Sequence, residues 1–169
     1  MKHSDWLAVF FALIILIGFF ALLSHSFGEE QELTAQDIKV IHNINRALAR
    51  SPLKDHGYWI VLYSKKYKQN PYLIFAIIKY ETSLGKHCPA KYNCFCRKNK
   101  WREQRKKGIW KKYPSFKMAI EDNCLHILEL WGEYTTPEKM TSGRIKYTTS
   151  WRKWRRSIKR YMRWMEGGK

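Results

Sequence analysis

Apolar residues in most of this chain recur at the three- and four-residue spacing that is typical of amphipathic helices. The pattern predicts five such helices, over residues 34–48, 58–67, 70–82, 115–131 and 149–165. Residues 87–113 break the pattern, because cysteines, Pro89, Gly108 and isolated aromatic residues follow one another there without helical periodicity. We therefore expect a mainly α protein with one small irregular lobe, which has room for a short β-hairpin.

Two of the predicted helices begin with specific signals. Thr34-Ala-Gln-Asp37 resembles a capping box with Asp in place of the usual Glu, and Pro52 ends the apolar run that follows it. Asn70-Pro71 combines a good N-cap residue with a proline at the first helical position. The apolar positions of the first helix are Ile38, Ile41, Ile44 and Leu48.

The helix predicted from Asn70 to Thr82 carries one acidic side chain, Glu81, near its end. The preceding residues make nearly every side of this helix apolar, so we expect it to be central and buried. A carboxylate at the C-terminal end of a buried helix is hard to ionise, because the helix dipole and the loss of water both oppose the charge. Glu81 is therefore a candidate acid, although a solvated Glu, or one paired with Lys79 or Lys86, is the plainer alternative.

The N-terminus predicts a membrane segment. Trp6 to Leu23 is a run of 18 residues without charge, about the minimum length for a helix that spans a bilayer. We interpret residues 1–23 as an uncleaved anchor in preference to a cleaved signal peptide, with 24–33 as a linker and 34–169 as the domain. Lys2 before the run and three glutamates after it predict a single-pass membrane protein, with a cytoplasmic N-terminus and its domain periplasmic or extracellular.

The charge balance predicts polyanionic partners. The chain has 32 Lys and Arg against 14 Asp and Glu, a formal net charge of +18. Nine of these cations and no acid lie between Arg144 and Arg163, with Trp and Tyr interleaved. This segment is either the solvated face of an amphipathic helix or a binding face. Export makes nucleic acid an unlikely partner and favours anionic wall polymer or lipid head groups.

Four cysteines, Cys88, Cys94, Cys96 and Cys124, all fall in the predicted exported domain. An even number in an oxidising compartment indicates disulfides, and four cysteines allow three pairings. A zinc site with His87 or His126 is the alternative, but the spacing of the cysteines does not match the usual zinc motifs. We therefore expect disulfides, and no metal or cofactor.

Four segments resemble, in order, motifs of the glucosaminidase-type hydrolases of the lysozyme superfamily. Glu81-Thr-Ser-Leu-Gly85-Lys86 is similar to their Glu-Ser-Gly-x-Gly-Lys motif, and Tyr92-Asn93-Cys94-Phe95-Cys96 stands where they carry Asn-Leu-Phe-Gly. Tyr113-Pro-Ser115-Phe116-Lys-Met-Ala119-Ile120-Glu-Asp122 resembles their Tyr-x-Ser-x-x-x-Ala-Ile-x-Asp segment, and Tyr147 resembles the tyrosine before their last helix. The likeness extends from Pro71 to Arg163.

This resemblance implies a lysozyme-like helical domain with a cleft between its core and the lobe. It implies an enzyme similar to mannosyl-glycoprotein endo-β-N-acetylglucosaminidases, and related to goose-type lysozymes and lytic transglycosylases, that cleaves peptidoglycan or a related anionic glycan. Glu81 is then the general acid, and Tyr147 steadies it or binds the acetamido group. The candidate substrate-binding residues are Ser83, Asn93, Phe95, Trp101, Trp110 and Tyr113. Phe95 and Tyr113 also fit the core of the lobe, and for Phe95 the core is the better interpretation.

The sequence gives no clear second carboxylate. Two-carboxylate glycosidases hold their acids roughly 5–9.5 Å apart, and the only acid from His87 to Lys112 is Glu103. A surface ion pair is the better interpretation of Glu103, so the acetamido group or the 6-hydroxyl of the substrate is the alternative nucleophile.

Two other classes of function stay open. One is a non-catalytic basic module that binds wall, membrane or DNA as part of a secretion or transfer apparatus. The other is a cysteine enzyme, with Cys88 or Cys94 as nucleophile and His87 or His126 as base.

Overall fold

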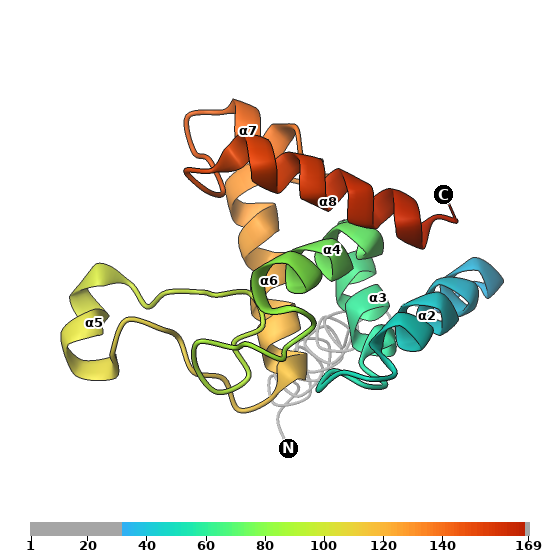
Figure 1. Cartoon of the computed structure of the whole chain (residues 1–169), viewed down its shortest axis with the longest axis horizontal. Helices are drawn as coiled ribbons and strands as arrows, with labels where there is room; N and C mark the ends of the chain where they lie inside the picture. Colours follow the sequence, from blue (N-terminus) through green and yellow to red (C-terminus); the bar gives the residue numbers. More distant parts are fainter. Residues whose placement is uncertain (1–31, 168–169) are drawn as a thin grey trace, which may run out of the picture. The chain divides into compact units, whose positions relative to one another are not determined.

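The computed structural model describes residues 32–167, which form seven helices (Figure 1). In chain order the helices are α2 (Ala35–Leu48), α3 (Gly57–Lys66), α4 (Pro71–Thr82), α5 (Trp101–Lys107), α6 (Phe116–Trp131), α7 (Lys139–Ser142) and α8 (Trp151–Met165). Within these residues the only β pairing is one isolated antiparallel bridge. The prediction of a mainly α protein is therefore confirmed.

No helix between residues 32 and 167 has the length and apolarity needed to cross a membrane. The predicted anchor, residues 6–23, lies outside the described residues, as does most of the predicted linker.

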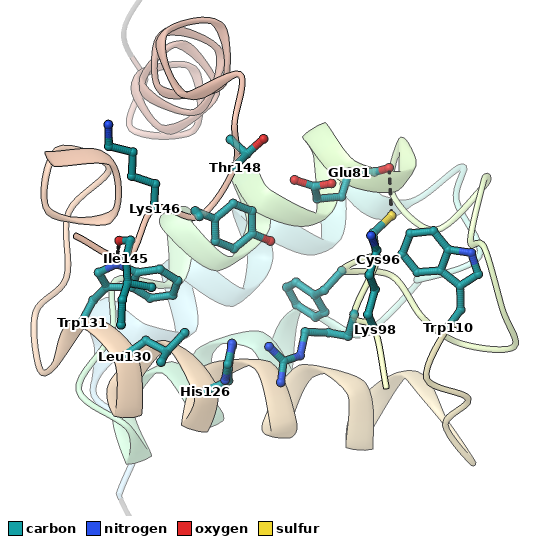
Figure 2. Close-up of a pocket in the computed structure, with 13 residues that line it drawn as sticks. Glu81, Cys96, Lys98, Trp110, His126, Leu130, Trp131, Ile145, Lys146 and Thr148 are labelled. Carbon is teal, nitrogen blue, oxygen red and sulfur yellow. Dashed lines mark hydrogen bonds between the residues drawn. The ribbon is translucent and has the colours of Figure 1, made fainter. Parts of the chain in front are cut away.

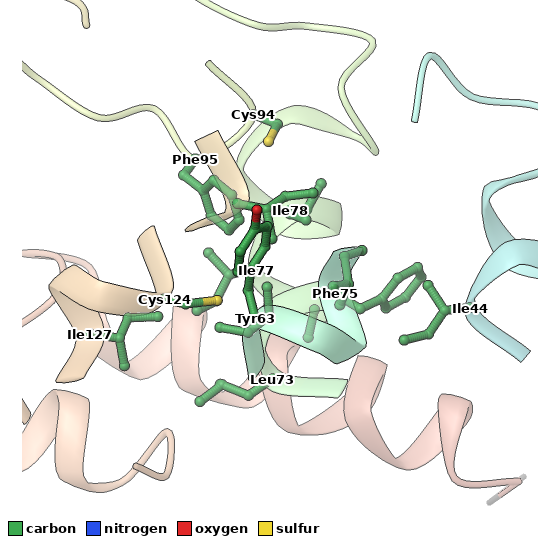
Figure 3. Packing of buried hydrophobic residues seen from close by; sticks show 14 of the residues in the cluster. Ile44, Tyr63, Leu73, Phe75, Ile77, Ile78, Cys94, Phe95, Cys124 and Ile127 are labelled. Carbon is green, nitrogen blue, oxygen red and sulfur yellow. The ribbon is translucent and has the colours of Figure 1, made fainter. Parts of the chain in front are cut away.

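Helix α4 is the centre of the fold, as its all-round apolar sequence predicts. Asn70 caps it by accepting a hydrogen bond from the backbone N–H of Tyr72 at 2.8 Å, and Pro71 occupies the first turn. The six residues from Leu73 to Ile78 are all fully buried. They pack against α8 on one side and α3 on another (Figures 1 and 3). Each large apolar side chain so buried contributes roughly 1.5–3 kcal/mol, so α4 is held by packing from several directions.

The predicted capping box of α2 is present. The Asp37 carboxylate accepts from the backbone N–H of Thr34 at 2.8 Å, and the Thr34 hydroxyl accepts from the Asp37 N–H at 3.2 Å. The buried stripe differs by one position from the predicted one. Val40, Ile44 and Leu48 face the core, whereas Ile38 is 59% exposed. Helix α2 packs mainly on α3, so only a narrow face of it is buried, and Ile38 falls outside that face.

Helix α6 follows the sequence signals closely. The Ser115 hydroxyl accepts a hydrogen bond from the Met118 N–H at 3.3 Å, and the helix ends at Gly132. Its buried positions include Ile120, Cys124 and Ile127, which face α3 and the core (Figure 3).

The lobe between α4 and α6 is a hairpin-like loop with a short helix at its tip. The backbone bonds Asn99 N–H to Ile109 O, at 2.9 Å, and Lys111 N–H to Arg97 O, at 3.0 Å, hold its two arms together. Helix α5 connects the two arms at the tip of the loop, and none of its residues is buried. The sequence did not predict α5, because a helix without a buried face leaves no apolar periodicity. The four-residue helix α7 was also missed, within the predicted connector after Thr135.

The predicted disulfides are not formed in the structure, where all four cysteines are free thiols. Cys94 and Cys124 are fully buried as small apolar groups, and Figure 3 shows them well apart. Residues 32–167 also contain no group of three or more His, Cys, Asp or Glu that could hold a metal ion.

The first prediction concerns Gly85, which terminates the α4 segment with a φ of +81°. A Cβ at this position would meet Leu53 Cδ1, the end of a fully buried side chain. We expect Gly85→Ala to lower the free energy of unfolding by roughly 2–5 kcal/mol, the sum of a left-handed backbone cost and an overpacking cost. Urea denaturation measures this loss.

The control is a double-mutant cycle with Leu53→Ala. Since that substitution removes the atom that the new Cβ would strike, Gly85→Ala should then cost only about 1–2 kcal/mol for the backbone. Fully additive losses would show that the contact with Leu53 is not the cause.

Candidate active site

The end of α4 brings Glu81 to the boundary between the helical core and the lobe. After Thr82 the chain turns sharply, because Ser83, Leu84 and Gly85 all have positive φ. The Thr82 hydroxyl accepts from the Gly85 N–H at 3.0 Å and lies 3.0 Å from the carbonyl oxygen of Cys94. The lobe is thereby fixed to the last turn of α4, one residue from Glu81.

Glu81 lines a cleft of about 400 Å³ (Figure 2). Its walls come from the end of α4, the two arms of the lobe, the C-terminal half of α6 and the segment that leads into α8. Figure 2 shows Glu81 and His126 on opposite walls, with Trp110 on the lobe. The remaining lining residues are Phe95, Cys96, Arg97, Lys98, Leu130, Trp131, Ile145, Lys146, Tyr147 and Thr148.

The Glu81 side chain is half-buried and sits beside a single hydrogen-bond donor from α8. Burial raises the pKa of the carboxyl above its ordinary value, and the Trp154 indole N–H, which donates to Oε1 at 3.3 Å, acts in the opposite direction. The burial effect is the larger of the two. Among the described residues no salt bridge includes Glu81, so the predicted alternative of a pair with Lys79 or Lys86 is wrong.

Tyr147 lies in the same cleft and is held by two tryptophans. Its ring stacks on that of Trp154, with centroids 4.7 Å apart, and its other neighbour is Trp131 at 5.9 Å. Burial, and to a smaller degree the nearby charge of Glu81, raise the pKa of the phenol well above its ordinary value. The Tyr147 hydroxyl is therefore a protonated donor at neutral pH.

His126 lies on the wall opposite Glu81 (Figure 2), and Arg97 also lines the cleft. Burial lowers the pKa of the His126 imidazole, and the neighbouring Arg97 guanidinium lowers it further. His126 is thus neutral at pH 7. Arg97 forms an ion pair with Asp122, in which its Nε lies 3.8 Å from the carboxylate.

The structure brings four of the nine predicted site residues to the cleft, namely Glu81, Tyr147, Phe95 and Trp110. Phe95 is only 2% exposed, so it is also part of the lobe core. The other five do not line it. Glu103 pairs with Lys107 at 3.3 Å on α5, and Trp101 on the same helix is 84% exposed.

Two of those five residues build the lobe instead. The buried side chain of Asn93 accepts from the Arg97 N–H at 2.8 Å and donates to Lys111 O at 2.9 Å, which holds both arms of the hairpin. The Tyr113 hydroxyl donates to the Asp122 carboxylate at 2.6 Å and so fastens the lobe to α6. Ser83 is an exposed residue in the left-handed C-cap of α4.

Neither Trp154 nor Arg97 was predicted to belong to the site, and His126 was named only as a zinc ligand or as the base of a cysteine enzyme. Trp154 was expected only as part of the apolar face of α8, and its fully buried ring does belong to the core. The hydrogen bond to Glu81 joins residues 73 positions apart, so no local pattern could have indicated it. His126 and Arg97 face the cleft from separate elements and carry no motif of their own.

The thiols do not support a cysteine nucleophile. Burial raises the pKa of Cys88 and raises that of Cys94 well above its ordinary value, which is the reverse of what activates a thiol. Cys96 lines the cleft, but its pKa is raised to about 11, chiefly by burial, and its Sγ lies 3.6 Å from the backbone oxygen of Glu81.

Comparison of the chain with protein-family models, with curated proteins and with solved structures gave no match. We therefore infer the class of protein from the residues of the site. It is a mainly helical protein whose cleft holds one half-buried carboxyl group, hydrogen-bonded to a tryptophan and flanked by aromatic and cationic side chains.

The raised pKa of Glu81 predicts a pH-dependent stability difference. A carboxyl whose folded pKa exceeds its unfolded pKa stabilises the fold below the unfolded pKa of about 4.3, and this stability is lost as pH rises through the folded pKa. Glu81→Gln has no ionisation. We therefore expect its free energy of unfolding, relative to the wild type, to increase with pH across that window. A difference that stays constant with pH would contradict the desolvation of Glu81.

Removal of the Trp154 donor should raise the pKa of Glu81 further, because only the ionised carboxylate gains strongly from that hydrogen bond. The measurement is NMR titration of the Glu81 side-chain carbonyl in Trp154→Phe. Trp151→Phe, on the same helix but outside the cleft, is the matched control and should leave the titration midpoint where it is. An unchanged midpoint in Trp154→Phe would show that the 3.3 Å contact does not stabilise the anion.

Proposed function

We propose that this protein is a glycosidase of the lysozyme superfamily that cleaves peptidoglycan-like glycan strands, with Glu81 as the general acid. The observation that carries the proposal is the position of the Glu81 carboxyl, half-buried, of raised pKa and facing a cleft. A glycosidic oxygen leaves poorly unless it is protonated, and only a carboxyl that keeps its proton near neutral pH can supply one.

The surroundings of Glu81 suit both halves of that proton transfer. Before transfer, burial favours the protonated form, which is the form that donates to the leaving oxygen. After transfer, the new carboxylate accepts the Trp154 N–H at 3.3 Å. That donor is rigid, because the Trp154 ring is fully buried and stacked on Tyr147. It therefore stabilises the anion without reorganisation.

The cleft offers a binding site of the right size and chemistry for sugars. Its volume of about 400 Å³ falls within the usual range for ligand sites, roughly 300–1,000 Å³. Trp110 presents a flat apolar surface on the lobe, and Lys98 lies 5.4 Å from its ring centroid. Tyr147 and Thr148 supply hydroxyl groups for an acetamido or hydroxyl substituent. Phe95 and Trp131 complete an apolar wall.

Glu81 is the only carboxylate among the residues that line the cleft. Glu103, the one acid that the sequence offered as a partner, lies on α5 in a pair with Lys107. The proposal therefore assigns the attack on the sugar to a group of the substrate, either its acetamido oxygen or its 6-hydroxyl, or to water. It makes no use of a protein nucleophile.

Two features support a lysozyme-like arrangement in particular. Glu81 lies in the last turn of the central helix α4, and the small lobe lines the same cleft. Tyr113 and Asp122, the ends of the third resembling segment, join that lobe to α6 through a 2.6 Å hydrogen bond. With the anchor predicted in residues 6–23, the proposed enzyme acts outside the cytoplasmic membrane while attached to it.

The test is Glu81→Gln, because glutamine keeps the shape of the side chain but donates no acid proton. We expect the release of fragments from purified peptidoglycan to fall by roughly 10²–10⁴-fold, the usual contribution of a general acid. Glu133→Gln is the matched control, since Glu133 pairs with Lys68 on the surface away from the cleft, and it should keep its rate within about twofold. Equal release by Glu81→Gln and the wild type would end the proposal.

Mass spectrometry of the released fragments tests the assignment of the nucleophile. A 1,6-anhydro end identifies attack by the 6-hydroxyl, and a free reducing end identifies hydrolysis through the acetamido group or water; the sugar at that end identifies the bond. Fragments cut only within the peptide stems would contradict a glycosidase.

A further inference from the structure

Helix α8 carries a second concave surface, which is separate from the cleft at Glu81. This groove, of about 550 Å³, is lined by Trp151, Arg152, Arg155, Arg156, Lys159 and Arg163. The side chains that α8 buries against the core are Trp154, Ile158 and Met165. Because the two sets alternate at helical spacing, α8 contributes to the core with one stripe and forms the groove with another.

Of the five cations that line the groove, only Lys159 forms a salt bridge among residues 32–167. Lys159 pairs with Glu138 at 2.8 Å, and Arg155 contributes to the lowered pKa of that glutamate. Over residues 32–167, no salt bridge involves Arg152, Arg156 or Arg163. The groove therefore attracts a ligand that carries several negative charges.

These cations work against the stability of their own helix. Four pairs of like charge stand four residues apart, namely 152 and 156, 155 and 159, 156 and 160, and 159 and 163. Such pairs destabilise a helix. Arg152 and Lys153 also lie in the first turn, where the helix dipole is positive and disfavours cations. An unfavourable arrangement of this kind is consistent with a binding role.

Trp151 organises one end of the groove. Its ring has three cations around it, with Lys146 at 5.4 Å and Arg152 and Arg155 each at 5.1 Å from the ring centroid. Cation–π contacts of this length keep the charged groups gathered at the mouth of the groove. Four of the five cations in the lining are arginines, whose planar fork matches the paired oxygens of a phosphate.

We propose that this groove binds a linear phosphodiester polymer of the cell wall. The cations recur once per helical turn, about 5.4 Å apart, which suits an extended chain with an anion in every repeat. A lipid surface fits less well, because a helix that enters a bilayer needs a free apolar face. The apolar stripe of α8 is already buried against α4. This proposal goes beyond glycan cleavage and does not depend on it; the choice of a wall polymer over nucleic acid rests on the predicted export of residues 34–169.

The experiment measures binding of the full chain, as the Glu81→Gln variant, to poly(glycerol phosphate). The groove variant carries Arg152→Gln, Arg156→Gln and Arg163→Gln. Its matched control carries Lys100→Gln, Arg105→Gln and Lys106→Gln, which remove the same charge from the exposed tip of the lobe. We expect the groove variant to bind at least roughly tenfold more weakly at about 150 mM salt, and the control to bind within about twofold of the parent.

A salt titration provides the second readout. If the three arginines each displace a counterion, their removal should lower the slope of log affinity against log salt by about 2. Thermal melts confirm folding, and the groove variant should melt no lower than the parent, because repulsive pairs have been removed. Retained binding in the groove variant, or an equal loss in the control, would overturn the proposal.

Two further ligands test the choice of partner. Vesicles of phosphatidylglycerol and a single-stranded DNA oligonucleotide are assayed with the same three proteins. Binding to either one that exceeds binding to the polymer, and that only the groove variant loses, would assign the groove to lipid or nucleic acid and contradict a wall polymer.

Discussion

The partial removal of the Glu81 carboxyl from water is the constraint on which the rest of the site depends. Helix α4 is apolar on nearly every side, so the fold encloses it between α8 and α3 and brings its last turn into the cleft. The carboxyl there meets low hydration and the negative end of the helix dipole at once. Trp154 provides the one side-chain hydrogen bond that it accepts within the described chain. Burial thus raises the pKa of the Glu81 carboxyl, and one fixed donor stabilises its anion.

Helix α8 connects the two surfaces for which functions are proposed. Its buried stripe places Trp154 against Glu81 and stacks it on Tyr147, whereas its exposed stripe forms the basic groove. The stability of α8 cannot come from its surface, which carries seven cations and no acid. It comes from packing on α4, and the same packing sets the environment of the Glu81 carboxyl. Substitutions in that packed stripe should therefore affect both surfaces, whereas changes in the groove affect one.

Long helices with a periodic apolar face could be predicted from the sequence, and the two short helices could not. The helices at α2, α3, α4, α6 and α8 were predicted to within about two residues, because each buries an apolar stripe and several carry cap signals. Helices α5 and α7 are short and were missed. Within the site, Glu81 was a candidate from its own helix and became the predicted acid through the resemblance of residues 81–86 to a glucosaminidase motif, but Trp154 reaches it across 73 positions. The periodicity of a single helix cannot predict such a contact. It also cannot predict the packing of the lobe that brings Tyr113 to Asp122.

A cleft with one carboxylate is sufficient for glycan cleavage if that group serves first as proton donor and then as counter-charge. In the proposed mechanism the proton leaves Glu81 as positive charge develops on the sugar ring, so the acid becomes the counter-charge when one is required. The cationic side chains of the cleft, Arg97 and Lys98 on the lobe and Lys146 before α8, oppose that charge if they lie close to the ring. Arg97, however, pairs with Asp122, and the Lys98 ammonium lies over the ring of Trp110. His126, on the wall opposite Glu81, adds no charge because burial and Arg97 keep it neutral. In the proposed mechanism, the electrostatics of the cleft therefore leave Glu81 as the group that responds to the reacting bond.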